Sequence, residues 1–284
     1  MSIERRPLGP GGGRVTSGGY RRPSEEPPSA DGVARAMSEQ VLSGVLRDGE
    51  KLPSERELAA RFGVGRPLIR EALRSLAELG LIETLPARGT FVRSGHDVRG
   101  NRQAAFAMRR RGVTAHELSE ARLMLETATA AQAARNADAR DIVELESILE
   151  ELDRATGVEH VERDLAFHLA IASAAHNPVI EMMLESIAVP TAALMFRSVG
   201  DPNVMQRSQP FHRVALEAIR ARDPEAAAEA IRAHLTVAQE LYGPDYERSV
   251  DELARQALAQ LGARTGLEDL VDRVLGARTA QRTS

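Results

Sequence analysis

The feature that most constrains the fold is a pair of short helical segments joined by a glycine-containing turn. Ser54 is followed three residues later by Glu57, a capping box that predicts the start of a helix. That helix is expected to end at Gly63, and the next to start near Pro67, because proline suits the first helical turn. Gly80 then supplies the residue type that most often follows a helix end. Two short helices connected in this way predict a helix-turn-helix.

A β-hairpin is expected directly after the second of these helices. The β-prone runs 81–85 and 90–92 flank a turn rich in proline and glycine at 86–89. Ahead of the pair, apolar residues recur with helical period and predict a first helix. These apolar residues are Val33, Met37, Val41, Leu42 and Val45. The combination predicts a winged helix-turn-helix domain over residues 31–96.

Arginines occupy the outer face of the second helix of the pair. Arg66, Arg70 and Arg74 recur every four residues, while the inward positions are apolar. The inward residues are Ile69, Ala72, Leu73 and Leu76. Taken alone, such a stripe is typical of a solvated face paired with acidic neighbours such as Glu71 and Glu78. Combined with the turn and the wing, it predicts a helix that enters the major groove of DNA, where arginine reads guanine with two donors.

Five stretches of this segment resemble the GntR family of bacterial transcription regulators. They are Leu52–Ala59, Gly63–Arg66, Ile69–Leu73, Gly80–Ile82 and Arg88–Val92. The resemblance covers about residues 33–92 and implies a DNA-binding winged helix, whose wing tip at Arg88 and Gly89 is expected to enter the adjacent minor groove. Gly65 departs from the Ser or Thr usual in the family, so one hydroxyl contact to phosphate is lost while the backbone N–H remains.

The basic residues of the helix pair are expected to make different DNA contacts. Arg70, one turn into the second helix, is the first candidate for a base contact, and Arg66 at the helix start is the second. Arg74 lies farther from the helix tip and is expected to contact phosphate. The resemblance implies that Arg56, in the first helix, contacts phosphate or a base.

The rest of the chain reads as a second, all-α domain. Residues 1–30 are rich in Gly, Pro, Ser and Arg and are expected to be a disordered tail, and residues 97–113 to be a basic linker. Helices are expected at 115–135, 138–155, 158–175, 177–197, 208–221 and 224–242. They form an effector domain over 114–242. Two weaker amphipathic stretches, 248–262 and 266–276, lie in a C-terminal extension over 243–284 whose role the sequence does not indicate.

Charge and composition separate the two domains and exclude several classes of protein. Residues 1–113 carry 20 Arg and Lys against 13 Asp and Glu, whereas the remainder carries 17 against 28, so only the first part is expected to meet a polyanion. Cysteine is absent, which excludes disulfides, thiolate metal sites and cysteine nucleophiles. No apolar run approaches the ~20 residues of a membrane helix. We therefore expect a cytoplasmic protein with no membrane contact.

An Asp and three His form a candidate metal site in the all-α domain. Asp164 and His168 lie one turn apart on one helix, His212 opens a later helix, and His234 closes the next. Since the start of one helix lies beside the end of the next in an antiparallel hairpin, His212 and His234 are expected to meet. Three imidazoles and one carboxylate suit a divalent transition metal, Zn²⁺ first, with Ni²⁺ or Mn²⁺ as alternatives. Taken singly, each histidine also fits a capping or core role.

The all-α segment resembles the FCD ligand-binding domain of the FadR subfamily. The resemblance covers about 114–242 and is carried by Asp164, Phe167-His168, Ala172-Ser173, Asn177-Pro178, Phe211-His212, Ala218-Ile219, Asp223, Ala227 and Ala233–Leu235. It implies that Asp164 and the three histidines bind a metal inside the helical bundle. Arg122 matches an arginine that related domains direct at an organic acid, although an exposed pair with Glu126 explains it equally well.

Two further residues are candidates for the effector site. Asn177 either lines the cavity or caps the helix beginning at Pro178, and Arg197 is a weaker candidate. An open metal position can coordinate a carboxylate, with an arginine as second anchor.

The sequence as a whole predicts a mainly α protein that acts as a homodimeric, ligand-responsive transcription regulator. Its expected partners are a short palindromic DNA operator, whose symmetry a two-fold dimer matches, and a small organic acid. The expected action is repression. An alternative keeps the DNA-binding role but replaces the metal and acid with an acyl-CoA-like effector. A more distant alternative is a metal-dependent hydrolase with an accessory DNA domain.

Overall fold

The structure is a computed structural model, and it describes residues 29–93, 98–260 and 266–282 in two compact units, residues 1–95 and 96–284. The expected disordered tail therefore lies outside the described residues, except for Ser29 and Ala30. Ser29 caps the first helix through its side chain, which accepts from the N–H of Gly32. Each unit is described by itself.

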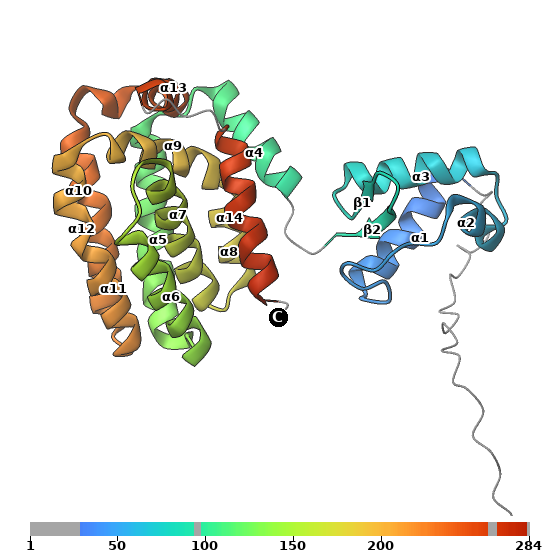
Figure 1. Ribbon diagram of the computed structural model, residues 1–284, viewed down its shortest axis with the longest axis horizontal. Helices are drawn as coiled ribbons and strands as arrows, with labels where there is room; N and C mark the ends of the chain where they lie inside the picture. The colour runs from blue at the N-terminus through green and yellow to red at the C-terminus, as the bar shows by residue number, and fades with distance from the viewer. Residues whose placement is uncertain (1–28, 94–97, 261–265, 283–284) are drawn as a thin grey trace, which may run out of the picture. The chain divides into compact units, whose positions relative to one another are not determined.

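The first unit is a winged helix. Its elements are α1 (Ala30–Leu42), α2 (Glu55–Phe62), α3 (Arg66–Glu78), β1 (Ile82–Leu85) and β2 (Gly89–Val92) (Figure 1). The two strands are antiparallel, with Ile82 opposite Val92 and Leu85 opposite Gly89. Helices α1 and α2 both pack on α3. The core residues include Met37, Leu58, Ile69, Leu76 and Ile82, all fully buried. The predicted helix-turn-helix and hairpin are confirmed.

The apolar stripe of the first helix is shorter than the sequence predicts. Helix α1 ends at Leu42, which is 77% exposed, and Val45 is 59% exposed in the turn that follows. Gly44 adopts a positive φ of 73° in this turn, so the chain leaves the helical path before Val45. Leu46, after the turn, is buried in the core of this unit instead. The predicted helical period therefore stops before Val45, because the turn breaks it.

The turn between α2 and α3 follows the local signals of the sequence. The Ser54 side chain accepts from the N–H of Glu57, and the Glu57 carboxylate accepts from the N–H of Ser54, which completes the capping box. Gly63 ends α2 in the left-handed conformation, with φ 67° and ψ 35°. A residue with a Cβ is strained there, which explains why the turn uses glycine.

Replacing Gly63 with alanine is expected to loosen this turn by about 1–2 kcal/mol, because Cβ crowds the carbonyl in the left-handed region. Amide hydrogen exchange in α2 and α3 of the full-length protein should accelerate roughly 5–30-fold. The matched control is Gly65→Ala, since Gly65 has an ordinary φ of −71° and its nearest contact for a Cβ is 3.5 Å. Equal acceleration in both variants would contradict the strain argument.

The second unit is a bundle of helices. They are α4 (Val98–Arg111), α5 (Ala115–Asn136), α6 (Ala139–Leu152), α7 (Gly157–Ala174), α8 (Pro178–Ser186), α9 (Ala188–Val199), α10 (Pro202–Ser208), α11 (Pro210–Arg220), α12 (Pro224–Tyr242), the short 3-10 helix η1 (Gly243–Glu247), α13 (Val250–Gln260) and α14 (Leu267–Arg282). Helix α7 is central: it packs on α5, α6, α9 and α14, and every residue from Asp164 to Ala175 is buried (Figure 1). A helix that is buried all round belongs in the core.

One expected helix is divided in the structure, and one helix, α10, lies where none was expected. The segment expected at 177–197 forms α8 and α9, which meet at Ile187 with a bend of 58°. The segment expected at 208–221 corresponds to α11, preceded by the separate α10, and Pro210 opens α11. Among the described residues, no single helix is long and apolar enough to cross a bilayer. The bent pair of α8 and α9 passes that criterion by length and composition together.

The segment expected as a basic linker is instead mostly the helix α4, and it packs within the second unit. Arg102 Nε donates to Asp272 at 3.1 Å, and Arg109 contacts Asp251 at 2.7 Å and Glu268 at 3.2 Å. These acids belong to α13 and α14, which also pack on α9. The C-terminal extension is therefore a layer of the bundle, and part of the basic charge ahead of residue 113 is neutralised inside this unit.

Candidate functional site

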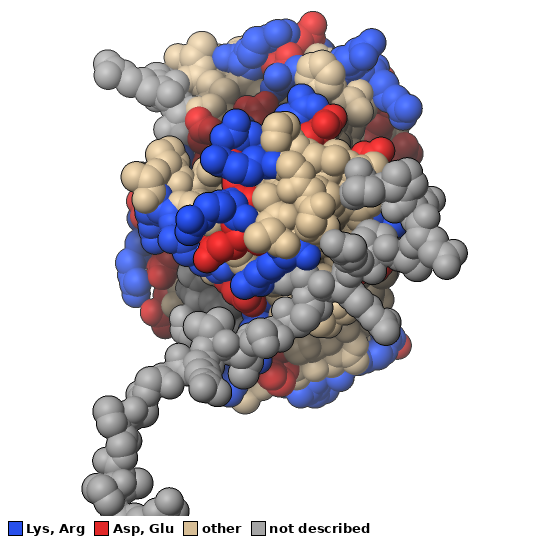
Figure 2. Space-filling model, turned by 90° about the vertical axis from the view of Figure 1, so that its right-hand side faces the viewer, with Lys and Arg blue, Asp and Glu red and all other residues tan. Residues whose placement is uncertain are grey.

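The outer face of α3 presents the predicted arginines to solvent. The side chains of Arg66, Arg70 and Arg74 are exposed, whereas Ile69, Ala72 and Leu76 on the opposite side are buried. Leu73 is only partly buried at the margin of the core. On the face of the molecule drawn in Figure 2, basic side chains lie in several groups with acidic side chains between them, so that face is not one unbroken field of positive charge.

A glutamate from α2 holds two of these arginines. Glu55 accepts from Arg70 Nε at 2.8 Å and lies 3.5 Å from Arg66 Nη2. Arg74 pairs more loosely with Glu78, at 3.8 Å. Sequence reasoning expected Glu78 as a partner but missed Glu55, because the contact crosses the turn between the two helices. Exposed pairs of this kind contribute little stability, so they do not prevent Arg70 from contacting a ligand.

The wing and the helix pair border an open hollow of about 1020 Å³, and its charged lining consists of five cationic residues and the carboxylates of Glu55 and Glu57. The cationic lining residues are Lys51, Arg61, Arg70, Arg74 and Arg88. Arg88 and Lys51 both lie over the ring of Phe91, at 5.9 Å and 5.8 Å from its centroid. Sequence reasoning did not single out Lys51 or Arg61. A basic hollow between a recognition helix and a wing suits the phosphate backbone of a duplex.

The remaining predicted DNA contacts lie on the same unit. Arg56 is exposed in the first turn of α2. Gly65 is the N-cap of α3 and provides no side-chain cap, as expected for a residue without a hydroxyl. Gly89, at the wing tip, has a φ of 116°, and a Cβ there would lie 2.8 Å from Lys51 Cε. The wing therefore uses glycine where the backbone comes closest to a basic side chain.

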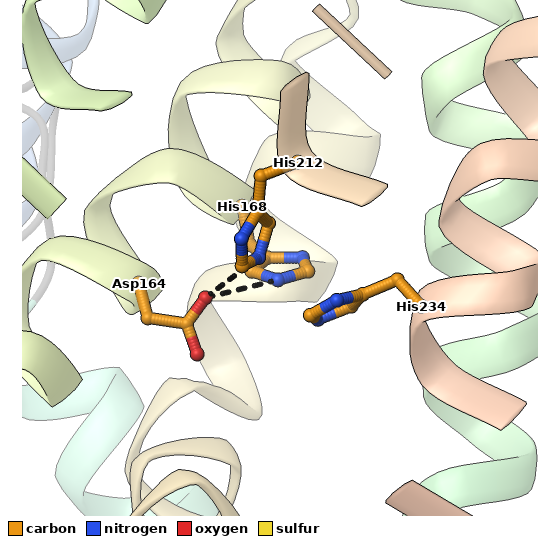
Figure 3. A group of neighbouring side chains, drawn as sticks. All are labelled: Asp164, His168, His212 and His234. Carbon is orange, nitrogen blue, oxygen red and sulfur yellow. Dashed lines mark ion pairs between the residues drawn. The ribbon is translucent and has the colours of Figure 1, made fainter. Parts of the chain in front are cut away.

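Asp164, His168, His212 and His234 converge in the core of the second unit. Their potential ligand atoms all lie within 4.8 Å of one another, and Figure 3 shows them directed at a common point from α7, α11 and α12. His212 Nε2 is 3.0 Å from Asp164 Oδ1, and His168 Nε2 is 3.5 Å from the same oxygen. The rings of His212 and His234 have centroids 4.3 Å apart. The structure thus brings the four predicted residues together.

The donor atoms of this cluster fit a divalent transition metal. Within the described residues, His168 Nε2, both ring nitrogens of His212 and Asp164 Oδ1 are buried without a hydrogen-bond partner. Buried polar atoms are normally satisfied, so several convergent orphans indicate a missing ligand. One carboxylate and three imidazoles are a donor set for Zn²⁺, Ni²⁺ or Mn²⁺. His234 Nδ1 faces the carbonyl of Ser208 at 3.2 Å, which favours the tautomer with a free Nε2.

The surroundings of the cluster lower the pKa values of Asp164 and His234 and raise the pKa of His168. Burial by itself raises the pKa of Asp164, but His168 and His212 hold it well below its usual range. Burial lowers the pKa of His168, but Glu126 and Asp164 outweigh it and raise the value to about 9. Burial and the neighbouring imidazoles His212 and His168 keep the pKa of His234 well below its ordinary value. A carboxylate and a neutral imidazole are the forms that bind metal, so His168, which is protonated at neutral pH, has to release one proton when the metal binds.

Arg122 lies beside this cluster, fully buried. Its Nε donates to Glu126 Oε1 at 2.6 Å, and its Nη2 is buried with no hydrogen-bond partner among the described residues. Arg122 lines a small cavity of about 30 Å³ together with Asp164, His212 and His234. The pair with Glu126 thus exists, but it is buried rather than exposed, and the guanidinium borders the same cavity as the cluster.

Two residues that the sequence analysis did not assign to the site complete these surroundings. Glu126 contacts His168 Nδ1 through its second oxygen. Burial raises its pKa, but Arg122 and His168 outweigh burial and lower the value to about 2. Tyr242 lines the cavity and shares a hydrogen bond of 2.9 Å with Ser198. A buried hydroxyl beside a buried guanidinium is a further polar contact for a small ligand.

Two effector candidates lie elsewhere. Asn177 caps α8, since its side chain accepts from the N–H groups of Val179 and Ile180, and it does not line the cavity. Arg197 pairs with Asp201 at 3.1 Å and Asp245 at 3.2 Å, and it lines a separate hollow. The structure therefore favours the capping role for Asn177 and an ion-pair role for Arg197, because their polar atoms are engaged by these partners.

Comparisons with known proteins agree with this architecture. Residues 29–92 match the gntR family of bacterial regulatory proteins, and residues 117–237 match the FCD domain. The Glc operon transcriptional activator of Escherichia coli strain K12 is 30% identical over 246 residues, which cover 82% of this chain and 96% of the relative. The galactonate operon transcriptional repressor of the same strain is 30% identical over 209 residues, covering 70% and 90%.

A solved structure supports the same assignment. Streptococcus agalactiae GntR matches with a TM-score of 0.62 at 28% identity, over 74% of this chain and 99% of that one. The winged helix with its arginine-bearing face and the helical unit with its buried polar cluster coincide with the two matched domains. The chain therefore belongs to the gntR family of bacterial regulatory proteins, and it is a DNA-binding transcription regulator with a C-terminal FCD domain rather than an enzyme.

Proposed function

We propose that this regulator is a homodimeric repressor that binds a short palindromic operator in the cytoplasm and responds to a small organic acid. In this proposal the FCD domain holds a divalent metal, Zn²⁺ first, through Asp164, His168, His212 and His234. The metal supplies an open coordination position for an oxygen of the acid when it is bound. Arg122 anchors the acid through its free donors.

The observation that carries this proposal is the buried Arg122 Nη2. This donor has no hydrogen-bond partner among the described residues, and the guanidinium lines the same cavity as the Asp and His cluster. A buried unpaired donor of a charged group is costly, so it indicates that an anionic ligand completes the site. An acid that reaches from the cluster to Arg122 would bind the metal with one oxygen and accept a hydrogen bond from Arg122 Nη2 with another.

The size of the cavity favours a small acid over an acyl-CoA. A cavity of about 30 Å³ has room for one or two water molecules, whereas pockets for larger ligands measure roughly 300–1,000 Å³. The name of one relative, the galactonate operon repressor, refers to a small hydroxy acid, which is consistent with this class. A small acid requires the helices around the cavity to move apart slightly, whereas an acyl-CoA would require them to separate much farther.

The DNA-binding part of the proposal concerns the arginines of α3 and the wing. Arg70 and Arg66 are assigned to bases, Arg74 to phosphate, Arg56 to phosphate or base, and Arg88 with Gly89 to the minor groove. Their exposure on one helix face and beside the basic hollow supports this assignment. A dimer would present two such faces to two half-sites.

A thermal-shift screen tests the effector assignment directly. We expect hydroxy and keto acids of two to six carbons to raise the melting temperature of Zn²⁺-loaded protein, and to do so less in protein stripped with a chelator, because binding to the folded state stabilises it. Acids that raise the melting temperature should then weaken the binding of the protein to the promoter fragment of its own gene, measured by fluorescence anisotropy. Stabilisation by acyl-CoA, unchanged after metal removal, would contradict the proposal.

A further inference from the structure

Glu126 joins the two halves of the proposed effector site. It lies on α5, one helical turn after Arg122, so both side chains leave the helix on the same face. One carboxylate oxygen accepts from Arg122 Nε at 2.6 Å, and the other contacts His168 Nδ1 on α7. All three side chains are buried, with relative exposures of 5 to 7%. The contacts form a continuous chain from the guanidinium to an imidazole of the cluster.

We infer that Glu126 is a positioning residue that fixes His168 for metal binding and connects it to Arg122. This inference rests on the proposed metal site and adds a residue that binds neither metal nor acid.

The first step of the argument is the tautomer of His168. A carboxylate accepts hydrogen bonds but cannot donate them when ionised, so the ring nitrogen that faces Glu126 must carry the proton. In the metal-bound form His168 has lost one of its two ring protons, and the proton that stays on Nδ1 leaves the lone pair on Nε2, the atom that lies 3.5 Å from Asp164 Oδ1 within the cluster. A carboxylate behind a histidine in this way orients the ring and increases its strength as a ligand.

The second step is the orientation of Glu126 itself. A buried carboxylate needs compensation, and Arg122 provides it through a charged hydrogen bond from Nε. Arg122 thereby keeps the second oxygen of Glu126 directed at His168. An anion that binds Arg122 would change the strength of the hydrogen bond between Arg122 and Glu126. The affinities for acid and for metal are therefore coupled through this carboxylate. By thermodynamic linkage, each ligand changes the affinity for the other by the same factor.

The test compares the affinity for Zn²⁺ of wild-type protein, Glu126→Gln and Arg122→Gln, by competition with a chromophoric zinc chelator. Loss of an outer partner of a metal-binding histidine weakens metal binding roughly 10–100-fold, and we expect that range for Glu126→Gln. Arg122→Gln should weaken Zn²⁺ binding as well, although Arg122 contacts no cluster residue directly. The matched control is Glu120→Gln on the same helix, where Glu120 is 64% exposed, and its affinity should equal that of the wild type.

The outcomes separate this inference from the proposed function. Failure of the wild-type protein to bind Zn²⁺ would refute the metal site itself. Tight binding by the wild type with affinities within twofold for Glu126→Gln or Arg122→Gln would overturn the role of Glu126 as a link. Circular dichroism establishes that each variant is folded.

A measurement on the wild-type protein keeps the inference testable even when a variant fails to fold. Nitrogen-15 NMR of the imidazoles in the Zn²⁺-loaded protein distinguishes a protonated Nδ1 from a metal-bound one. The His168 signals, identified by their absence in His168→Gln, should show a protonated Nδ1 and a metal-bound Nε2. The opposite pattern would overturn the inference, because Glu126 would then face a metal-bound nitrogen instead of a protonated one.

Discussion

Replacing His212 with alanine is expected to weaken metal binding about 100-fold. His212 is the innermost of the four residues: its side chain is 2% exposed, Nε2 lies 3.0 Å from Asp164 Oδ1, and its ring packs edge-on against Phe167 at 5.1 Å. Structural zinc sites bind with about 10–16 kcal/mol, so one ligand of four accounts for roughly 3 kcal/mol. The variant should bind Zn²⁺ about 100-fold more weakly, and should lose the rise in melting temperature that the metal gives the wild type.

The measurement is metal content by mass spectrometry after dialysis, followed by calorimetric titration with Zn²⁺. The control is His116→Ala, which removes a partly exposed imidazole paired with Glu120 and Glu247 at 3.5 Å and should leave the metal content unchanged. A Zn²⁺ affinity of His212→Ala within twofold of the wild type would show that the cluster is not the metal site.

Replacing Arg70 with alanine is expected to weaken binding to the operator by about 1–3 kcal/mol, or roughly 5- to 150-fold, and to relax the preference for one base. Glu55 engages Arg70 through Nε only, so the two Nη groups are the donors available for guanine O6 and N7. Fluorescence anisotropy with the operator and with single-base variants measures both effects. Arg70→Lys should behave like alanine in base preference, because lysine cannot make the paired contact.

The matched control for Arg70 is Arg74, one turn farther along the same face. Arg74→Ala should weaken binding to all sequences alike and make the affinity less dependent on salt, because a phosphate contact releases counterions but reads no base. An unchanged base preference in Arg70→Ala would show that another residue is the reader.

The parts of the structure that sequence reasoning predicted depend on short-range signals. The capping box at Ser54, the left-handed Gly63 and the hairpin around Arg88 are each set by a few neighbouring residues. The meeting of His212 and His234 was predictable because helical hairpin geometry fixes which ends lie together. Their common proximity to Asp164 then follows once α11 and α12 pack on α5, which also packs on α7.

The parts that were missed depend on long-range packing. Arg122 and Glu126 read as a possible exposed pair, because nothing local reveals that α12 covers this face of α5. The contact between Glu55 and Arg70 depends on how α2 crosses α3. Likewise, Arg102 and Arg109 look like linker charges until the acids of α13 and α14, more than a hundred residues later, are seen beside them.

The position of α13 and α14 has a practical consequence for fragment design. The stretch that matches the FCD domain stops at residue 237, ahead of both helices. A truncation at that boundary would strip Leu253 and Leu270 from the apolar surface of α9 and leave Arg109 without its two acids. Expression trials of the isolated second unit should therefore retain the chain from α4 through α14. A shorter product would expose apolar surface and is expected to aggregate.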